Sequence, residues 1–274
     1  MTYYEICEKL QNAGIENADT EAGILLAHFC GVRASELPFR RKEEFDCSAL
    51  CAAVERRAIR EPLQYLLGEW EFFGLPFSVN PSTLIPRPDT EILVEQALTL
   101  VPRGAYFADF CTGSGCIAAA VLVNRPDTSA VLVDAFAQTL DTAKQNCAKN
   151  GVKDRAQFVL RDLLCPLEGA FEPGFDCILS NPPYIPTEVV MGLAPELAHE
   201  PQVALDGGED GMRFYRHFLS QSEHVLKKDG FWLFEIGYDQ EQAICTLAEE
   251  FGFACRIVYD LGGNPRVAHV YRTK

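Results

Sequence analysis

Hydrophobic positions at helical spacing run through the first 67 residues. Apolar residues three or four apart predict helices over residues 3–13, 20–30 and 47–59, with a short helical piece over residues 35–39. Asp19 and Asp46 directly precede two of these helices and are expected to be their N-caps. The segment contains no cluster of reactive side chains. We therefore expect residues 1–68 to form a small helical domain that docks a partner rather than performs chemistry.

The pattern becomes aromatic and extended directly after this segment. The string GEWEFFGLPFSV (residues 68–79) carries Gly74 and Pro76 at places typical of a hairpin turn. We predict a β-hairpin linker over residues 69–85. The next strong pattern is an amphipathic helix over residues 90–100.

Strands and helices alternate through the rest of the chain. Apolar runs predict strands over residues 106–110, 130–134, 157–161, 175–180, 231–235, 255–260 and 267–271. Helical patterns lie between them over residues 116–123, 137–150, 212–227 and 240–251. This order is typical of an α/β domain with a mostly parallel sheet covered by helices on both faces. We assign residues 86–274 to it and expect its last two strands to be an antiparallel pair at one edge.

Composition narrows the possible functions. The chain has 24 basic and 39 acidic residues, a net charge of −15, which argues against a protein that coats DNA or RNA. It has neither a signal-like apolar region nor an uncharged apolar stretch of membrane-spanning length, so we expect a cytoplasmic protein without membrane contact. The eleven cysteines form no C-x-x-C pair and the five histidines no cluster, so we expect reduced thiols and no metal site.

Small residues follow the first strand of the alternating region in the string DFCTGSG (residues 109–115). Such residues let the backbone of a strand-to-helix turn approach a ligand closely. The string is not G-x-G-x-x-G, and Asp109 would repel a pyrophosphate while suiting the ammonium group of an amino acid. This favours S-adenosylmethionine over NAD. The alternative is an ordinary glycine-containing turn.

Acidic residues close the next two strands. Asp134 can accept hydrogen bonds from both hydroxyls of a ribose, although a surface aspartate is the alternative. Asp162 is the corresponding candidate for the edge of an adenine, with Leu163 packed against the ring.

The most specific string is Asn181-Pro182-Pro183-Tyr184, directly after the apolar strand at residues 175–180. The prolines hold the backbone rigid, so the Asn181 side-chain oxygen and the Pro182 carbonyl can act as a pair of acceptors. A planar NH₂ group fits between them, and Tyr184 offers a face for stacking.

Taken in order, these strings resemble class I S-adenosylmethionine-dependent methyltransferases that act on planar nitrogens. The string LIPRPDTE (residues 84–91), the N-terminal helices, the aromatic hairpin and YDLGGNPR (residues 259–266) narrow the resemblance to the HemK/PrmC family. Members are protein-(glutamine-N5) methyltransferases that modify the Gly-Gly-Gln loop of peptide chain release factors. The resemblance covers nearly the whole chain. It implies a Rossmann-like domain with a seven-stranded sheet, S-adenosylmethionine as methyl donor and a release factor as partner, with no stably bound nucleic acid. Nothing demands more than a monomer.

The resemblance also implies roles for individual residues. Cofactor contacts are expected from Asp109, Cys111, Thr112, Gly113, Ser114, Gly115, Asp134, Asp162, Leu163 and Asn181. Asn181, Pro182 and Tyr184 are the expected catalytic residues. They would bind the substrate glutamine together with Pro183, and Leu84 would pack against the same side chain.

Two positions depart from the family pattern. The family usually has glycine at the position of Cys111 and commonly an aromatic residue at that of Leu163. Because cysteine has a Cβ atom, we expect a negative φ at residue 111 and a slightly altered cofactor pocket.

Three other functions share some of these features. A DNA or RNA amino-methyltransferase would use the same acceptor pair, but the acidic charge, the lack of a target-recognition domain and LIPRPDTE argue against it. A ribosomal-protein glutamine methyltransferase usually departs from PRPDTE. A silent binding module would not need an intact Asn181–Tyr184 string or the Gly113 and Gly115 turn.

Two further features have open interpretations. Residues 186–211, rich in Glu, Pro and Gly, form either a lid over the pocket or a solvated loop. Glu235 either lines the site or caps a strand end in solvent.

Overall fold

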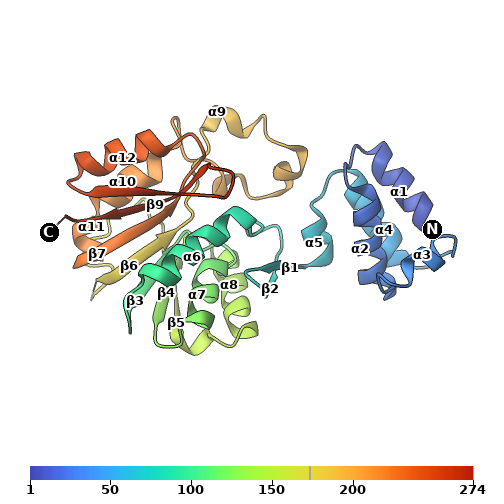
Figure 1. The fold of residues 1–274 in the computed structure, drawn as a ribbon, viewed down its shortest axis with the longest axis horizontal. Helices are drawn as coiled ribbons and strands as arrows, with labels where there is room; N and C mark the ends of the chain where they lie inside the picture. Colours follow the sequence, from blue (N-terminus) through green and yellow to red (C-terminus); the bar gives the residue numbers. More distant parts are fainter. Residues whose placement is uncertain (173, 274) are drawn as a thin grey trace. The chain divides into compact units, whose positions relative to one another are not determined.

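The computed structural model describes residues 1–172 and 174–273. The chain forms two compact units (Figure 1). Residues 1–69 and 194–199 make up the first, and the other described residues make up the second. No helix in the described residues is long and apolar enough to cross a membrane.

The first unit consists of short helices around a core of its own. Its helices are α1 (Tyr3–Asn12), α2 (Ala18–Cys30), α3 (Leu37–Arg40), α4 (Ser48–Ala58) and α5 (Leu63–Leu67). Apolar side chains from α1, α2 and α4 meet in the core, among them Ile6, Leu10, Leu25, Leu50 and Val54. The helical spacing seen in the sequence is therefore the spacing of the buried positions.

Both predicted N-caps in this unit are wrong. Helix α2 begins ahead of Asp19, whose charge lies in the first turn and favours the helix dipole without capping. Helix α4 is capped by Cys47, whose Sγ accepts a hydrogen bond from the Leu50 N–H at 3.5 Å, so Asp46 lies one residue outside.

Residues 194–199 are held in this unit by charge. The Arg57 guanidinium is buried; its Nε donates to Glu21 at 2.6 Å and its Nη1 to Glu196 at 3.3 Å. Arg60 pairs with the same Glu196 at 2.8 Å. Glu196, from the middle of the chain, thus pairs with two arginines of the helical unit, and Glu21 supplies a second negative charge beside Arg57.

The second unit begins with the predicted hairpin. Strands β1 (Glu69–Phe72) and β2 (Leu75–Ser78) pair in a two-stranded sheet. Phe73 and Gly74 form the turn with φ values of 53° and 71°, the left-handed conformation that tight hairpin turns require. Phe72 and Phe77 point into the apolar core of this unit, with their rings 6.0 Å apart.

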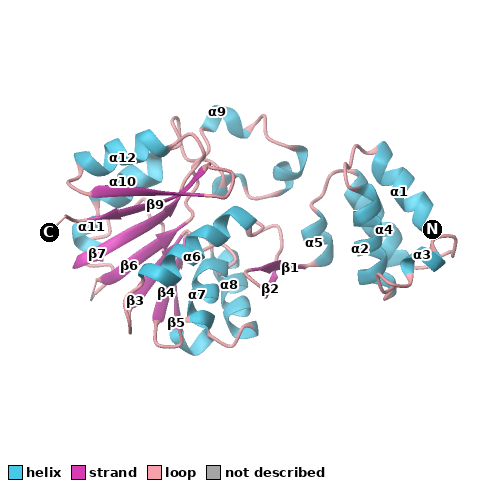
Figure 2. Cartoon of the chain, viewed as in Figure 1, coloured by secondary structure: helices cyan, strands magenta, loops and turns pink. Residues whose placement is uncertain are grey.

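A seven-stranded sheet forms the centre of the second unit (Figure 2). Its strands are β3 (Tyr106–Phe110), β4 (Ser129–Asp134), β5 (Ala156–Leu160), β6 (Phe175–Ser180), β7 (Leu226–Glu235), β8 (Ala254–Tyr259) and β9 (Pro265–Tyr271). They lie in the order β5-β4-β3-β6-β7-β9-β8, and only β9 runs antiparallel to its neighbours. The prediction of a mostly parallel sheet with an antiparallel end is confirmed. Strand β9 inserts between β7 and β8, which leaves β8 at the edge.

Helices cover both faces of this sheet, as predicted. Helices α6 (Glu91–Leu100), α7 (Cys116–Asn124) and α8 (Ala137–Lys149) pack on one face, and α10 (Arg213–Ser220), α11 (Ser222–Val225) and α12 (Glu241–Glu250) on the other. Consecutive strand residues point to opposite faces: Phe107 belongs to the first core and Ala108 to the second, as do Leu179 and Ile178. Because both faces are buried at the centre of the sheet, the central strands β3, β4 and β6 are nearly continuous apolar runs.

One predicted helix is shorter than expected. The helical pattern over residues 212–227 ends in α11 at Val225, and β7 begins at Leu226, which pairs with Phe175 of β6. Pairing with the neighbouring strand overrides the helix preference of the lysines that follow.

Short helical turns complete the fold. They are η1 (Pro88–Thr90), η2 (Lys153–Arg155), α9 (Thr187–Val190), η3 (Pro195–His199) and η4 (Gln202–Ala204). Since β3 to β7 are parallel, their carboxyl ends meet at one edge of the sheet. Phe110, Asp134, Ser180 and Glu235 end neighbouring strands there.

Candidate active site

The turn after β3 uses left-handed backbone at three alternate positions. Cys111, Gly113 and Gly115 have φ values of 59°, 56° and 77°. The predicted negative φ at Cys111 is therefore wrong. Every second residue of this turn has a left-handed backbone, and Cys111 occupies one of these positions, as the two glycines do. A Cβ atom on Gly115 would lie 3.0 Å from the Ala143 Cβ, so glycine there lets α7 and α8 approach closely. A Cβ on Gly113 would meet nothing within 4 Å.

Asp109 stabilises this turn by hydrogen bonds and does not line the cavity. Its buried Oδ2 accepts hydrogen bonds from the Thr112 hydroxyl at 2.7 Å and the Ala118 N–H at 3.2 Å. Burial raises the pKa of Asp109 to about 7, although these two bonds oppose the rise. Its other oxygen, Oδ1, is buried without a hydrogen-bond partner among the described residues.

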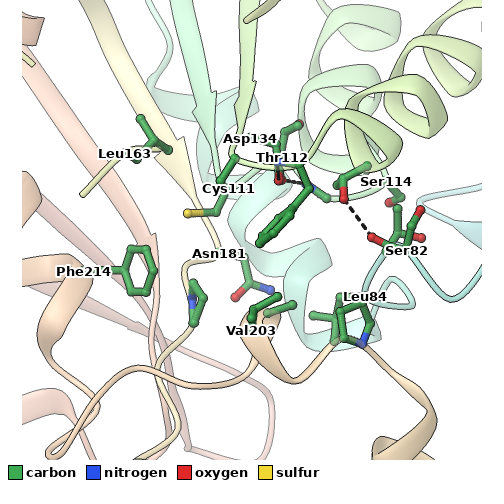
Figure 3. Close-up of a pocket in the computed structure, with 18 of the residues that line it drawn as sticks. Ser82, Leu84, Cys111, Thr112, Ser114, Asp134, Leu163, Asn181, Val203 and Phe214 are labelled. Atoms are coloured by element: carbon green, nitrogen blue, oxygen red, sulfur yellow. Dashed lines mark hydrogen bonds between the residues drawn. The ribbon is translucent and has the colours of Figure 1, made fainter. Parts of the chain in front are cut away.

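Asp134, at the end of β4, joins the turn to the next helix. Its Oδ2 accepts from the Gly113 N–H at 3.1 Å, as Figure 3 shows, and its Oδ1 from the Phe136 N–H at 3.2 Å. Burial raises the pKa of this carboxyl group, and the backbone donors partly offset that effect. Asp162 is exposed and lies two residues beyond the end of β5, where its Oδ1 accepts from the Leu164 N–H, while Leu163 beside it is buried.

The Asn181–Tyr184 string follows β6 at the centre of the sheet. Just before it, the Ser180 hydroxyl donates to the Phe110 carbonyl oxygen at 2.6 Å and ties β6 to β3. Asn181 lines the cavity and its Nδ2 donates to Thr90 Oγ1 at 3.3 Å. The Tyr184 hydroxyl points away from the cavity lining to Glu235 Oε1 at 3.4 Å, and its carbonyl accepts from Gln240.

The opposite wall is the segment at residues 82–90, which Glu200 holds in place. The side chain of Glu200 is buried; it accepts a hydrogen bond from the Ile85 N–H at 3.0 Å and pairs with Arg87. Asp89 pairs with Arg266 at 3.0 Å. These polar contacts anchor the wall, and Arg87 also lines the cavity.

Together these elements enclose a cavity of about 310 Å³, a size typical of small-molecule sites. Of the residues predicted from the sequence, it is lined by Leu84, Cys111, Thr112, Gly113, Ser114, Asp134, Asp162, Leu163, Asn181 and Pro183. Asp109, Gly115, Pro182 and Tyr184 lie behind the lining. In Figure 3 the Asn181 amide lies between Cys111 on one side and Val203 and Leu84 on the other.

Several lining residues were not predicted from the sequence. They are mainly Thr90, Phe136, Val203 and Phe214. Thr90 is part of the LIPRPDTE string, which was one available signal. Val203 belongs to residues 186–211, for which a lid over the pocket was one of the two open interpretations, whereas the sequence around Phe136 and Phe214 gives no sign that these residues reach the strand ends. The cavity chemistry combines carboxylates at two strand ends with a small-residue turn, which suits a ligand with hydroxyl and ammonium groups.

Comparisons with known proteins agree with this architecture. The PrmC N-terminal domain family matches residues 4–68, and the methyltransferase small domain family matches residues 88–259. A methyltransferase from Pyrococcus furiosus shares the fold, with a TM-score of 0.56 at 16% identity over 74% of this chain and 91% of that one. The second unit therefore has a methyltransferase fold.

More similar relatives identify the family. The release factor glutamine methyltransferase of Caulobacter vibrioides is 38% identical over 95% of this chain and 91% of that protein. The release factor-specific protein-(glutamine-N5) methyltransferase of Alicyclobacillus acidocaldarius is 31% identical over 72% of this chain and all of that one, with a TM-score of 0.44. The chain belongs to the release factor glutamine methyltransferase family.

Proposed function

We propose that this chain transfers a methyl group from S-adenosylmethionine to the side-chain amide nitrogen (N5) of the glutamine in the Gly-Gly-Gln loop of peptide chain release factors. The observation that carries the proposal is the position of Asn181. Its rigid string places a side-chain amide on the cavity, opposite the LIPRPDT wall, in a chain of the release factor glutamine methyltransferase family.

The cavity residues fit the proposed cofactor. Space beside Gly113 is open, so a ligand can lie against the backbone of the turn. Asp134 would accept hydrogen bonds from the ribose hydroxyls, and Asp162 and Leu163 would contact the adenine. Burial keeps the Cys111 thiol neutral by raising its pKa well above the ordinary value, so this side chain would contribute packing rather than charge. When bound, S-adenosylmethionine supplies an activated methyl group on a sulfonium centre.

The substrate amide needs orientation more than a base. Its nitrogen is a poor nucleophile because the lone pair is delocalised into the carbonyl group. Hydrogen bonds from the substrate NH₂ to Asn181 Oδ1 and to the Pro182 carbonyl would align the nitrogen and stabilise the positive charge that develops on it. Tyr184 and Pro183 would confine the amide plane, and Leu84 the aliphatic part of the side chain. The proton would leave after the methyl group has transferred.

The helical domain would select the substrate. We assign residues 1–68 to docking of the release factor body, residues 69–85 to the linker and residues 86–274 to catalysis. The protein would act as a cytoplasmic monomer without stably bound nucleic acid. Support for the docking role comes from the match to the PrmC N-terminal domain over residues 4–68.

A methyl-transfer assay tests this function. Labelled S-adenosylmethionine is offered with a release factor, its Gln→Ala loop variant, ribosomal protein and DNA, and the product is located by mass spectrometry. We expect label on the loop glutamine alone. Label on ribosomal protein or DNA would agree with methyl transfer from S-adenosylmethionine but would refute the release factor as the substrate.

A second experiment tests the acceptor pair. Asn181→Ala should abolish most methyl transfer while S-adenosylmethionine still binds, because two acceptors become one. Near-normal transfer by this variant would contradict the mechanism.

A further inference from the structure

Thr90 has a hydroxyl group that its helix does not use. Threonine at the start of a helix usually caps it, yet the Thr90 side chain makes no capping hydrogen bond to α6, and its backbone is already helical with φ −66° and ψ −20°. The side chain is buried. Its Oγ1 instead lies 3.3 Å from Asn181 Nδ2, the amide nitrogen of the proposed acceptor residue.

Glu235 faces the same group from the end of β7. It is buried, and the hydroxyls of Thr90 and Tyr184 stabilise its ionised form. Oε1 lies 3.4 Å from the Tyr184 hydroxyl. Oε2 is buried and has no hydrogen-bond partner among residues 1–172 and 174–273, so one acceptor is free. Three elements far apart in sequence thus bring an amide, a hydroxyl and a carboxylate together.

The donor and acceptor groups of these side chains determine which side of the Asn181 amide faces Thr90. An ionised carboxylate can only accept, a hydroxyl can donate one proton and accept another, and an amide offers a donor on one side and an acceptor on the other. If the Thr90 hydroxyl, which stabilises the ionised form of Glu235, donates its hydrogen bond to that carboxylate, the Thr90 oxygen must accept from Asn181. The Asn181 NH₂ group is then committed to Thr90, and Oδ1 is left to face the substrate.

We propose that Thr90 and Glu235 are positioning residues that hold the Asn181 amide with its oxygen toward the substrate NH₂. This inference rests on the proposed function, because it matters only if Asn181 must act as an acceptor. With the amide turned over, two NH₂ groups would face each other and the substrate would lose a hydrogen bond.

Protonation of Glu235 would remove the preference for one orientation of the Asn181 amide. A neutral carboxyl group can donate to Thr90, which can then donate to Asn181 Oδ1 and stabilise the reversed amide. Burial raises the pKa of Glu235 to about 7; Asp89 adds to the rise, and Arg266 opposes it together with the two hydroxyls. Tyr215 and Cys116 lie within electrostatic reach of the carboxyl group, and burial raises the pKa of both, which keeps them neutral. Activity should therefore fall as the pH drops through about 7.

Kinetics of three variants test the proposal on the full chain. Thr90→Val removes the acceptor at similar volume and should lower kcat about 3- to 10-fold, the effect of one hydrogen bond, with KM for S-adenosylmethionine unchanged. Thr90→Ser keeps the hydroxyl and should restore kcat to within about twofold. Glu235→Gln should lower kcat at pH 8 and abolish the loss of activity between pH 8 and pH 6, since its amide cannot ionise.

Tyr215→Phe is the matched control. The Tyr215 hydroxyl donates to the main-chain oxygen of Glu235 at 2.7 Å, so the variant loses a buried hydrogen bond to the same residue without touching the amide contact. It should lose stability but keep both kcat and the pH dependence of the unchanged protein. If Tyr215→Phe matched Thr90→Val in kcat, general loosening of this region would explain both results and the proposal would fail.

A measurement without substrate separates this inference from the proposed function. The Asn181 side-chain NH₂ signal in a ¹⁵N NMR spectrum, assigned with Asn181→Asp, should shift and exchange faster with solvent in Thr90→Val but not in Tyr215→Phe. An unmoved signal together with unchanged kcat would overturn the proposal. Should Thr90→Val not fold, an unaltered pH profile in Glu235→Gln would overturn the proposal equally. If the unchanged protein methylates no release factor, the proposed function fails and the NMR result alone decides the amide contact.

Discussion

A left-handed residue other than glycine lies in the turn that would hold the cofactor. Cys111 has φ 59°, a conformation that an L side chain adopts at a cost of about 1–2 kcal/mol. Replacing it with glycine and, separately, with alanine isolates that cost. Both variants lose the thiol, so the loss of its packing cancels when they are compared. Only the Cβ atom differs between them.

The expected difference follows from two opposing effects. Glycine escapes the steric cost of the left-handed backbone, but it loses about 0.5–1 kcal/mol more conformational entropy on folding than alanine does. The net result is a glycine variant more stable than the alanine variant by roughly 0.5–1 kcal/mol. At a position with ordinary backbone, alanine is more stable than glycine by about the same amount. The sign of the stability difference between the glycine and alanine variants therefore shows whether the backbone at residue 111 is strained.

Urea unfolding measures this difference. The two tryptophans, Trp70 and Trp232, both lie in the second unit, so their fluorescence follows the domain that contains the turn. Cys116, in the first turn of α7 and buried at the same site, is the matched control: Cys116→Ala should be more stable than Cys116→Gly. If alanine is also the more stable replacement at residue 111, the argument for strain in this turn is refuted.

Three further predictions concern buried or partly buried carboxylates. Glu200→Ala should lower the free energy of unfolding by about 2 kcal/mol, because a buried N–H and an arginine lose their partner, whereas the exposed Glu209→Ala should change it little in the same urea experiment. Asp134→Ala should weaken S-adenosylmethionine binding roughly 10- to 100-fold by calorimetry, and the exposed Asp141→Ala should not; equal affinity in Asp134→Ala would exclude a ribose contact. The raised pKa of Asp109, about 7, means that its folded form keeps a proton that the unfolded chain releases, so its contribution to stability is lost as the pH rises from about 4 to 7. The stability of Asp109→Asn relative to the unchanged protein should therefore increase over that range and level off above it, and a constant difference would contradict the assignment.

Much of this architecture can be predicted from the sequence because it follows from periodic burial. The central strands β3, β4 and β6 are apolar runs buried on both faces, and most of the site strings stand directly after strands, where parallel strands end together. The φ at Cys111 could not be predicted from residue type, since the turn imposes it. Asp19 and Asp46 failed as N-caps because a capping residue type also occurs near a helix start without capping it. The position of Glu200 depends on a contact with Ile85, 115 residues away in sequence, which no local pattern contains.

The LIPRPDT wall shows how such distant contacts organise the site. Glu200 holds Ile85 and Arg87, Arg266 holds Asp89, and Thr90 accepts from Asn181. The charged groups of the string are thus used in anchoring, and its lining of the cavity comes from Leu84, Ile85, Pro86, Arg87 and Thr90. Because the partners come from three different segments, each substitution in the string loosens the wall at one point. Such variants should impair the positioning of bound ligands and leave the reacting groups themselves unchanged.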